Sequence, residues 1–409
     1  EWYGNKVTIL AYNDENSNYK PLPFNFERDS RATVVNKAGL IETVGAGMPR
    51  IDYKDDSKGA LLLEPARTNL LPYSEDIESW SISGVITKEN NVAISPDGTL
   101  NAGTITTNDA SGFNRITQTI SVSSNSTYTS SLFIKKVQSQ TNYMGIGFIF
   151  TGGTTDVGYV IFDAVNGIAV SADVRIDVIS EVKDFGDYWK LQSTATDNGS
   201  NTSLQFNIYA TLSTNGTTTN LGISSPRTIW GIQVEQGSYA TSYIPTSGSA
   251  VTRVADASSQ TTPDGVIGQT EGTLFFEIDF ANTSGVAGAW SITSGSSANR
   301  ITMNTTNLSS TQFTLSVAQN YNSGSTKLAS ANVTFSDKHK VAIKYSGTTL
   351  KLFVDGQLSD SVSTDGFGNY TKFYVGANQV GVGGDARKFI QADLYNTALT
   401  DQELIALTQ

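Results

Sequence analysis

The sequence predicts an all-β protein: two tandem β-sandwich (jelly-roll) domains, an extended N-terminal arm and a short C-terminal helix. Short runs of alternating apolar and polar residues recur along the chain. Only 16% of the residues are charged, and Ser, Thr, Asn and Gly supply most of the polar surface. Alternation with a period of two is typical of half-buried strands, and Gly and Asn turns join such strands in sandwiches.

The arm is predicted over residues 1–72. Its apolar pieces, such as 60–63, are short. Prolines interrupt regular structure at positions 21, 23, 49, 65 and 72. We expect a few small strands here, in a segment that packs along its own domain or along a neighbouring subunit.

The first sandwich is predicted over residues 73–247, where strands with turns between them follow one another and no helical pattern appears. Asn166-Gly167 favours a type I′ hairpin turn, because both central positions of that turn need positive φ. The expected strands are 116–122, 128–134, 143–150, 158–162, 188–195, 204–209 and 228–234.

Residues 248–270 are rich in Ser, Thr, Pro and Gly and are predicted to form a linker. Residues 271–409 are predicted as the second sandwich. Its strand 273–280 alternates cleanly, and Asp355-Gly356 is a good hairpin signal. A three-strand meander is expected over 341–345, 349–354 and 357–362.

The C-terminal helix is predicted over 401–407. Thr400 is placed as its N-cap and Glu403 as the capping-box partner, with Leu399 and Leu404 forming a hydrophobic staple. A helix this short is not stable alone, so we expect it to dock on the sandwich.

Charge and composition exclude several functions. The net charge is −11 and no basic run exists, so nucleic-acid binding is not expected. No stretch approaches the roughly 20 apolar residues of a membrane helix, so membrane insertion is not expected either. The absence of cysteine excludes disulfides and thiolate sites. No cofactor is expected. A structural calcium ion is possible, although no Asp-x-Asp-x-Asp loop identifies its ligands.

Two stretches carry a resemblance to one group of proteins. The first comprises residues 31–44, 49–53 and 59–70, and the second comprises 231–246 and 251–256. Together they resemble bacteriophage and prophage virion structural proteins of the tail-fibre or head-fibre type. The resemblance implies a carbohydrate-binding-module-like sandwich, a place on the extracellular virion surface, other virion proteins as partners, and a homotrimer.

The last domain resembles the laminin-G and concanavalin-A-like jelly rolls. The resemblance is carried by residues 338–345, 350–356 and 393–404. It implies the fold more than the function, because this fold hosts lectins, glycanases and adhesion modules.

Catalytic motifs are weak. His339 is the only histidine, and its place between two lysines at a strand entry favours an exposed surface position. Glu277-Ile-Asp279 resembles the start of the Glu-x-Asp-x-x-Glu strand of retaining jelly-roll glucanases, but Asn282 replaces the second glutamate. An asparagine cannot act as the acid/base. We therefore interpret Glu277 and Asp279 as outward-facing strand residues and expect no enzyme.

Aromatic residues in polar surroundings are candidate sugar platforms, because the C–H face of a pyranose stacks on an aromatic ring. The candidates lie in the last domain, where we expect loops at the sandwich end to carry the site. They are Trp290, Arg300, Tyr321, Tyr370, Asp385 and Arg387.

Three hypotheses follow. The chain is a phage virion surface or fibre protein that binds host cell-surface polysaccharide without cutting it. Alternatively, it is a purely structural virion protein that decorates a capsid or spaces a fibre. The third and least favoured hypothesis is a polysaccharide depolymerase, which would need a convergent pair of carboxylates.

Overall fold

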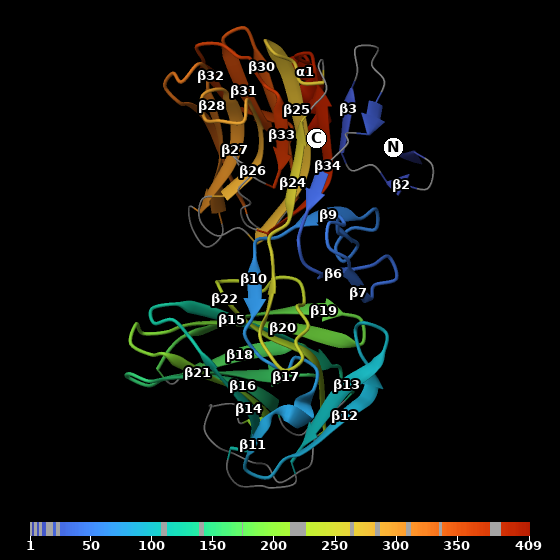
Figure 1. Ribbon diagram of the computed structural model, residues 1–409, viewed down its shortest axis with the longest axis vertical. Coiled ribbons are helices and arrows are strands. Elements are labelled where there is room, and N and C mark those ends of the chain that lie inside the picture. The colour runs from blue at the N-terminus through green and yellow to red at the C-terminus, as the bar shows by residue number, and fades with distance from the viewer. Residues whose placement is uncertain are drawn as a thin grey trace. The chain divides into compact units, whose positions relative to one another are not determined.

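The computed structural model divides the chain into two compact units (Figure 1). Unit 1 comprises residues 1–39, 43–66 and 254–409, and unit 2 comprises 40–42 and 67–253. The structure describes residues 2–3, 6–7, 10–13, 19–21, 25–107, 113–138, 143–173, 175–212, 226–261, 266–282, 287–307, 312–334, 338–376 and 386–409.

Unit 2 is a sandwich of two six-stranded sheets. The sheet named here the β14 sheet has the order β11 (Ser81–Ser83), β14 (Arg115–Ser121), β21 (Ser203–Leu212), β16 (Tyr143–Thr151), β17 (Asp156–Asp163) and β18 (Ile168–Asp173). The β22 sheet has the order β12 (Thr87–Ile94), β13 (Leu100–Thr106), β22 (Arg227–Gln236), β15 (Thr127–Lys135), β20 (Tyr188–Thr196) and β19 (Val178–Phe185). The 3-10 helix η1 (Ile77–Ser79) precedes β11.

Period-two alternation builds the core of unit 2. On β21, Leu204, Phe206 and Ile208 are fully buried in it. Phe148 lies beside Phe206 in the same sheet, and Leu132 of the β22 sheet belongs to the same core. Burying these apolar faces against one another is the main force that holds the two sheets together.

Unit 1 is also built on two sheets. The β27 sheet has the order β29 (Lys327–Thr334), β28 (Gln312–Asn320), β27 (Arg300–Asn307), β26 (Ala287–Thr293), β33 (Lys372–Val375), β24 (Ala257–Thr261) and β5 (Asn25–Glu27). The β25 sheet has the order β32 (Gln357–Ser363), β31 (Thr349–Val354), β30 (Lys338–Ser346), β25 (Glu271–Asn282), β34 (Ala386–Tyr395), β3 (Leu10–Asn13) and β4 (Tyr19–Pro21), with β9 (Ala60–Leu63) on β34 and β8 (Ile51–Asp52) on β9.

The remaining strands form short pairs. These are β1 (Trp2–Tyr3) with β2 (Lys6–Val7), β6 (Ala32–Val35) with β7 (Ile41–Val44), and β10 (Arg67–Asn69) with β23 (Val251–Arg253). The all-β class with one short C-terminal helix agrees with the prediction.

The N-terminal segment is more integrated than an extended arm. Strand β3 runs parallel to β34, β9 pairs with the other end of β34, and β5 pairs with β24. The predicted linker 248–270 contains β23 and β24, and β24 pairs with β33 as well as with β5. Backbone hydrogen bonds form a ladder without apolar side chains, which is why a Ser- and Thr-rich stretch looked like a linker.

The C-terminal helix α1 (Asp401–Leu407) begins and ends where the sequence predicted. The Thr400 side chain accepts from the Glu403 backbone N–H, and the Glu403 carboxylate accepts from the Thr400 backbone N–H. Leu404 of the helix is fully buried against Phe275 and Phe353 on one face of the β25 sheet. This face is therefore covered by the helix.

One of the two predicted hairpin turns has type I′ geometry and the other does not. Asp355 and Gly356 both have positive φ, as a type I′ turn requires, and they join β31 to β32. The turn between β17 and β18 is longer than predicted: the Gly167 N–H donates to the Asp163 carbonyl, and only Gly167 has positive φ. The Asp163 carboxylate accepts from the Val165 and Asn166 backbone N–H groups, which stabilises this wider turn.

In each unit, residues of the first resembling stretch contact residues of the second stretch. In unit 1, Arg50 forms ion pairs with Glu64 and Asp256, and Arg28 forms a second ion pair with Asp256. In unit 2, Asn69 donates to the carbonyls of Ile232 and Ile244. These motif residues hold distant segments together and are buried, so they are structural.

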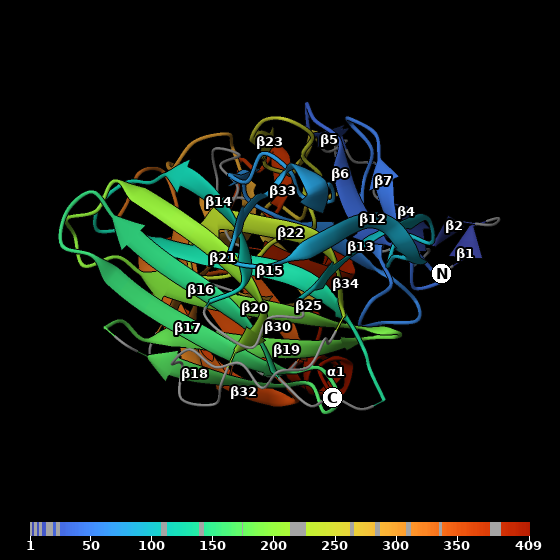
Figure 2. The same ribbon diagram turned by 90° about the horizontal axis from the view of Figure 1, so that it is seen from below.

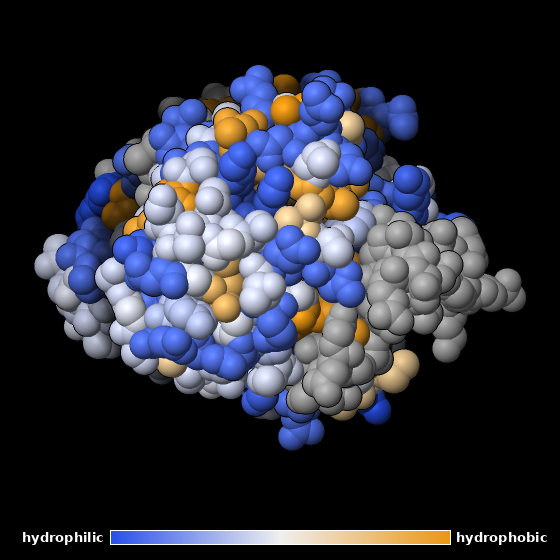
Figure 3. All heavy atoms as spheres, turned by 90° about the horizontal axis from the view of Figure 1, so that it is seen from above, coloured by the Kyte–Doolittle hydropathy of each residue, from blue (hydrophilic) through white to orange (hydrophobic). Residues whose placement is uncertain are grey.

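In the part of the chain that the structure describes, no helix has the length and apolarity needed to cross a membrane. Figure 3 shows one face of the molecule, on which hydrophilic and apolar side chains are interspersed.

Candidate functional site

The β14 sheet has an outer face that points away from the core of unit 2. Its strands lie side by side in the order β14, β21, β16, β17 and β18 (Figure 2). Because Ile116 and Ile208 point into the core, their neighbours in sequence, Arg115, Thr117, Asn207 and Tyr209, point to the outer face.

Four polar side chains form a compact block on this face. Arg115 lies opposite Tyr209 in the strand register, and Thr117 lies opposite Asn207. Each has a buried polar atom without a hydrogen-bond partner among the described residues: Arg115 Nε, Thr117 Oγ1, Asn207 Oδ1 and Tyr209 Oη. Most buried polar atoms in folded proteins are hydrogen-bonded. We call these four residues the polar block; Asn207 and Tyr209 are fully buried and Thr117 is 8% exposed, so the block lies beneath the surface of this face.

An aromatic layer borders the polar block. Tyr209 and Tyr159 meet edge to face with ring centroids 5.8 Å apart. Phe113 lies 5.8 Å from Tyr209 and stacks on Tyr159 at 6.3 Å. Both tyrosine rings lie against Gly147, where an added Cβ would be 2.9 Å from Tyr209 and 3.1 Å from Tyr159. A side chain at this position would clash with both rings, so glycine is needed for the rings to pack flat against the sheet.

A pocket of about 190 Å³ opens next to this layer. It is lined by Tyr143, Ile161, Asp163, Ile168 and Val170 from β16, β17 and β18. Only Gly145, which has no side chain, separates Ile161 from Tyr209 across the sheet. Ile168 and Val170 are 52% and 53% exposed, so the pocket has an open apolar wall.

The polar block contains one buried phenol, Tyr209, and one cation, Arg115. Burial raises the pKa of Tyr209, so its phenol stays protonated and can donate. The Arg115 guanidinium lies 5.8 Å from the centre of the Tyr209 ring. Apolar rings beside unpaired polar atoms can bind a ligand with both C–H faces and hydroxyl groups.

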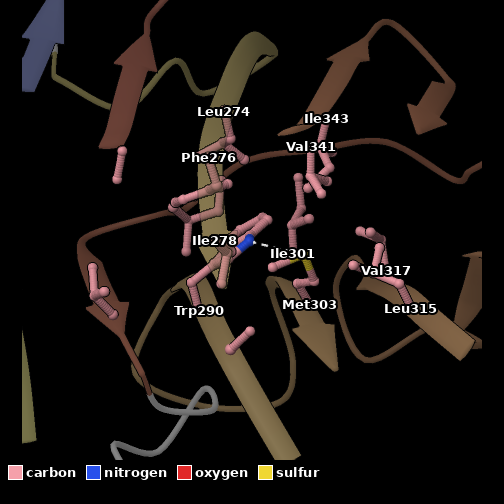
Figure 4. Packing of buried hydrophobic residues seen from close by; sticks show 14 of the residues in the cluster. Leu274, Phe276, Ile278, Trp290, Ile301, Met303, Leu315, Val317, Val341 and Ile343 are labelled. Carbon is pink, nitrogen blue, oxygen red and sulfur yellow. Dashed lines mark hydrogen bonds between the residues drawn. The ribbon is translucent and has the colours of Figure 1, made fainter. Parts of the chain in front are cut away.

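The predicted site residue Trp290 is not at the surface. It is fully buried in the core of unit 1, where its ring stacks on Phe276 at 4.8 Å and its Nε1 donates to the Met303 sulfur at 3.3 Å (Figure 4). The polar residues around Trp290 in the sequence gave a wrong indication, because they alternate with core residues along the same strand.

Tyr370 and Arg387 are also buried. The Tyr370 backbone bonds to the Gln269 side chain, and its ring meets Tyr345 at 6.1 Å. Arg387 is 2% exposed, donates to Thr305 Oγ1 and lies near the Phe280 ring. Neither side chain is accessible as a sugar contact. Asp385 lies outside the described residues.

Arg300 and Tyr321 lie at one end of unit 1. Arg300 Nε donates to Asn320 Oδ1 at 2.8 Å, and Tyr321 follows Asn320 directly. The Tyr321 ring packs on Gly366, where an added Cβ would be 3.0 Å away. Both residues are half-buried, so two of the six predicted site residues are near one another and partly accessible.

The catalytic candidates do not form a site. Glu277 and Asp279 lie on the opposite side of β25 from the buried Phe276, Ile278 and Phe280, as predicted. His339 was predicted to be exposed but is 5% exposed, with Nδ1 2.7 Å from Asp355 Oδ2. Among the described residues, no group of three or more His, Asp or Glu could hold a metal ion.

The polar block could have been found from the sequence by following both faces of each strand. On 204–210, the even-numbered positions are apolar, so Asn207 and Tyr209 share the other face with Gln205. Tyr159 and Tyr143 alternate with core residues in the same way. The strand order, which brings these faces together, could not be derived from the alternation.

No family model matches the chain, and no curated protein matches it in sequence. The chain is similar to the solved structure of the Ruminococcus gnavus IT-sialidase CBM40 bound to α2,3-sialyllactose (20% identity, 35% of this chain and 84% of that chain, TM-score 0.30). It is also similar to a heptameric SAP-like pentraxin from Limulus polyphemus (11%, 35% and 73%, 0.27) and to mouse laminin α1 domains LG4-5 (14%, 66% and 82%, 0.23).

Proposed function

We propose that the chain is a non-catalytic glycan-binding protein of a phage-type virion surface, and that the outer face of the β14 sheet holds the sugar. The observation that carries the glycan-binding part is the open pocket on this face, whose lining combines apolar and aromatic side chains with the Asp163 carboxylate. A pyranose presents an apolar face and a rim of hydroxyls, and this face offers partners for both.

The virion part of the proposal is supported by the resemblance of residues 31–70 and 231–256 to phage structural proteins. It includes the extracellular virion surface as location, other virion proteins as partners, host surface polysaccharide as ligand, and a homotrimer. Measuring the mass of the purified chain in solution tests the trimer separately from sugar binding.

The test is binding of the purified chain to a panel of bacterial cells, with and without periodate oxidation of their surface sugars. Binding that periodate abolishes supports a glycan receptor. Absence of binding across a broad panel would overturn the proposal and favour the purely structural virion role.

Variants then locate the site. Tyr143→Ala removes the aromatic wall of the pocket. We expect cell binding to weaken at least tenfold, because a sugar ring loses the surface on which it stacks. Tyr53→Ala, which removes a half-buried tyrosine of unit 1, is the matched control. Equal binding by both variants would exclude this pocket of the β14 sheet as the site.

A further inference from the structure

Unit 1 has an outer face of its own, on the side of the β27 sheet that points away from the core. Trp290, Ile292, Ile301 and Met303 point inward, so the residues between them point outward. On the five strands β29, β28, β27, β26 and β33, the outward positions that the structure describes are mostly Ser, Thr and Asn, and none is a carboxylate.

Two cations stand on this face in one row. Thr293 pairs with Arg300 on one side and with Lys372 on the other. Since neighbouring strands are about 4.8 Å apart, the Cα atoms of Arg300 and Lys372 are about 10 Å apart. Thr293 itself is fully buried, and the half-buried Arg300 and Lys372 on either side of it can contact one anionic group at the surface.

Neither cation has a carboxylate partner among the described residues. Arg300 bonds through Nε to the neutral side chain of Asn320, and Lys372 Nζ lies near Gly295, where an added Cβ would be 3.6 Å away. By contrast, Lys344 and Lys351 on the other sheet are both paired with Asp401. Two cations without a described carboxylate partner make this part of the face locally positive, which attracts an anion although the net charge of the chain is −11.

The next row offers one contact to a sugar ring. Ser291 pairs with Thr302 and with Tyr374. Ser291 and Thr302 are fully buried, so neither side chain can touch a ligand. Tyr374 beside them is half-buried, and its ring can stack on one sugar face.

We infer that this face of unit 1 is a second binding site, specific for saccharides that carry an anionic group, with Arg300 and Lys372 contacting that group and Tyr374 contacting the ring. Two cations are too few to hold a nucleic-acid backbone, which needs many phosphate contacts. The planar fork of Arg300 suits a carboxylate or a sulfate. The site is independent of the polar block in unit 2.

The test is calorimetric titration of the full chain with three oligosaccharides: oligogalacturonate, its methyl ester, and a sulfated neutral galactan oligosaccharide. We expect oligogalacturonate to bind at least tenfold more tightly than the ester, with an affinity that falls as salt is raised. Binding of the sulfated sugar alone supports the same site and assigns sulfate as the anion. Equal binding of the ester, or no binding of either anionic sugar, would overturn the inference.

Variants assign the binding to these residues. The double change Arg300→Ala and Lys372→Ala is expected to weaken oligogalacturonate binding at least tenfold. Lys37→Ala, which removes an exposed lysine elsewhere in unit 1, is the charge control and leaves binding unchanged. Tyr374→Ala tests the ring contact with the charges retained and is expected to weaken binding several-fold. Unchanged affinity in the double variant contradicts the assignment. Tyr143→Ala leaves this site intact, so failure of one site is distinguishable from failure of the other.

Discussion

Arg50 and Asp256 form a buried ion pair across 206 residues of sequence. Both side chains are fully shielded from solvent. Arg50 also donates to Glu64 at 2.7 Å, and Asp256 accepts a further bond from Arg28 at 2.9 Å. Each charge in this network has a partner of opposite sign, which is the condition under which buried charges are tolerated. The network joins the N-terminal segment to the chain that enters the second sandwich.

Removing one member of this network strongly destabilises unit 1. Asp256→Ala leaves Arg28 and Arg50 buried without their shared carboxylate, and we expect a loss of about 3–5 kcal/mol in the free energy of unfolding. Denaturant titration followed by tryptophan fluorescence measures it. Asp365→Ala is the control, because the Asp365 pair with Lys327 is solvent-exposed and worth less than about 1 kcal/mol. Equal effects of the two changes would show that the network contributes little.

This network marks the limit of prediction from the sequence. The motifs around Arg50, Glu64 and Asp256 were evident as patterns, but nothing in their local sequence says that they meet. Strands and the helix follow from short-range alternation and capping, and these predictions were largely confirmed. Segment 1–72 and the predicted linker lack such alternation, so their pairing with β33 and β34 depends on long-range backbone bonds that leave no local signal.

Three of the six predicted site residues are buried, and for Trp290 the reason is related. It was chosen because its sequence neighbours are polar, but on a strand the neighbours of a residue point to the opposite face. Tyr370 lies outside the strands, and Arg387 was chosen as a polar contact; both side chains are buried in unit 1. An outward position does not by itself make a residue accessible, because Ser291 is fully buried whereas Arg300 is half-buried.

Replacing Trp290 tests its assignment to the core. Trp290→Ala is expected to lower the free energy of unfolding by about 3–5 kcal/mol, because it removes a fully buried aromatic side chain. Trp290→Phe keeps an aromatic ring against Phe276 and is expected to cost less. Glycan binding by the folded Trp290→Phe variant should equal that of the parent chain. A selective loss of binding in that variant would make Trp290 a ligand contact after all.

His339 is expected to be a structural residue. Its two ring nitrogens lie 2.7 Å from Asp355 Oδ2 and 2.9 Å from the Thr334 carbonyl oxygen. His339→Phe keeps an aromatic ring but removes both polar contacts of the ring, and we expect a loss of about 1–3 kcal/mol in the free energy of unfolding, measured by heat or denaturant. Lys340→Ala on the same strand is the control, with a loss below about 0.5 kcal/mol. A stability unchanged by the His339 substitution would mean that water replaces the ring without cost.

Docking of the C-terminal helix is expected to weaken in acid through Asp401. The hydrogen bond from Lys351, reinforced by Lys344, holds the pKa of Asp401 below the ordinary aspartate value. Its charged form is therefore favoured in the folded state. Above the unfolded pKa of about 3.9 this contribution to stability is fully present, and it is lost as the pH falls through the lower folded value.

The measurement is the free energy of unfolding at intervals between pH 6 and pH 3 for the parent chain and for Asp401→Asn. The amide cannot titrate, so the variant should be less stable at pH 6, and its stability should converge on that of the parent as the pH falls. In a Lys351→Ala background, Asp401→Asn should change stability less, because the main cause of the shift is already gone. Parallel pH curves for the parent and Asp401→Asn would exclude Asp401 as a source of the acid sensitivity and would leave the Thr400–Glu403 capping box as the main polar anchor of the helix end.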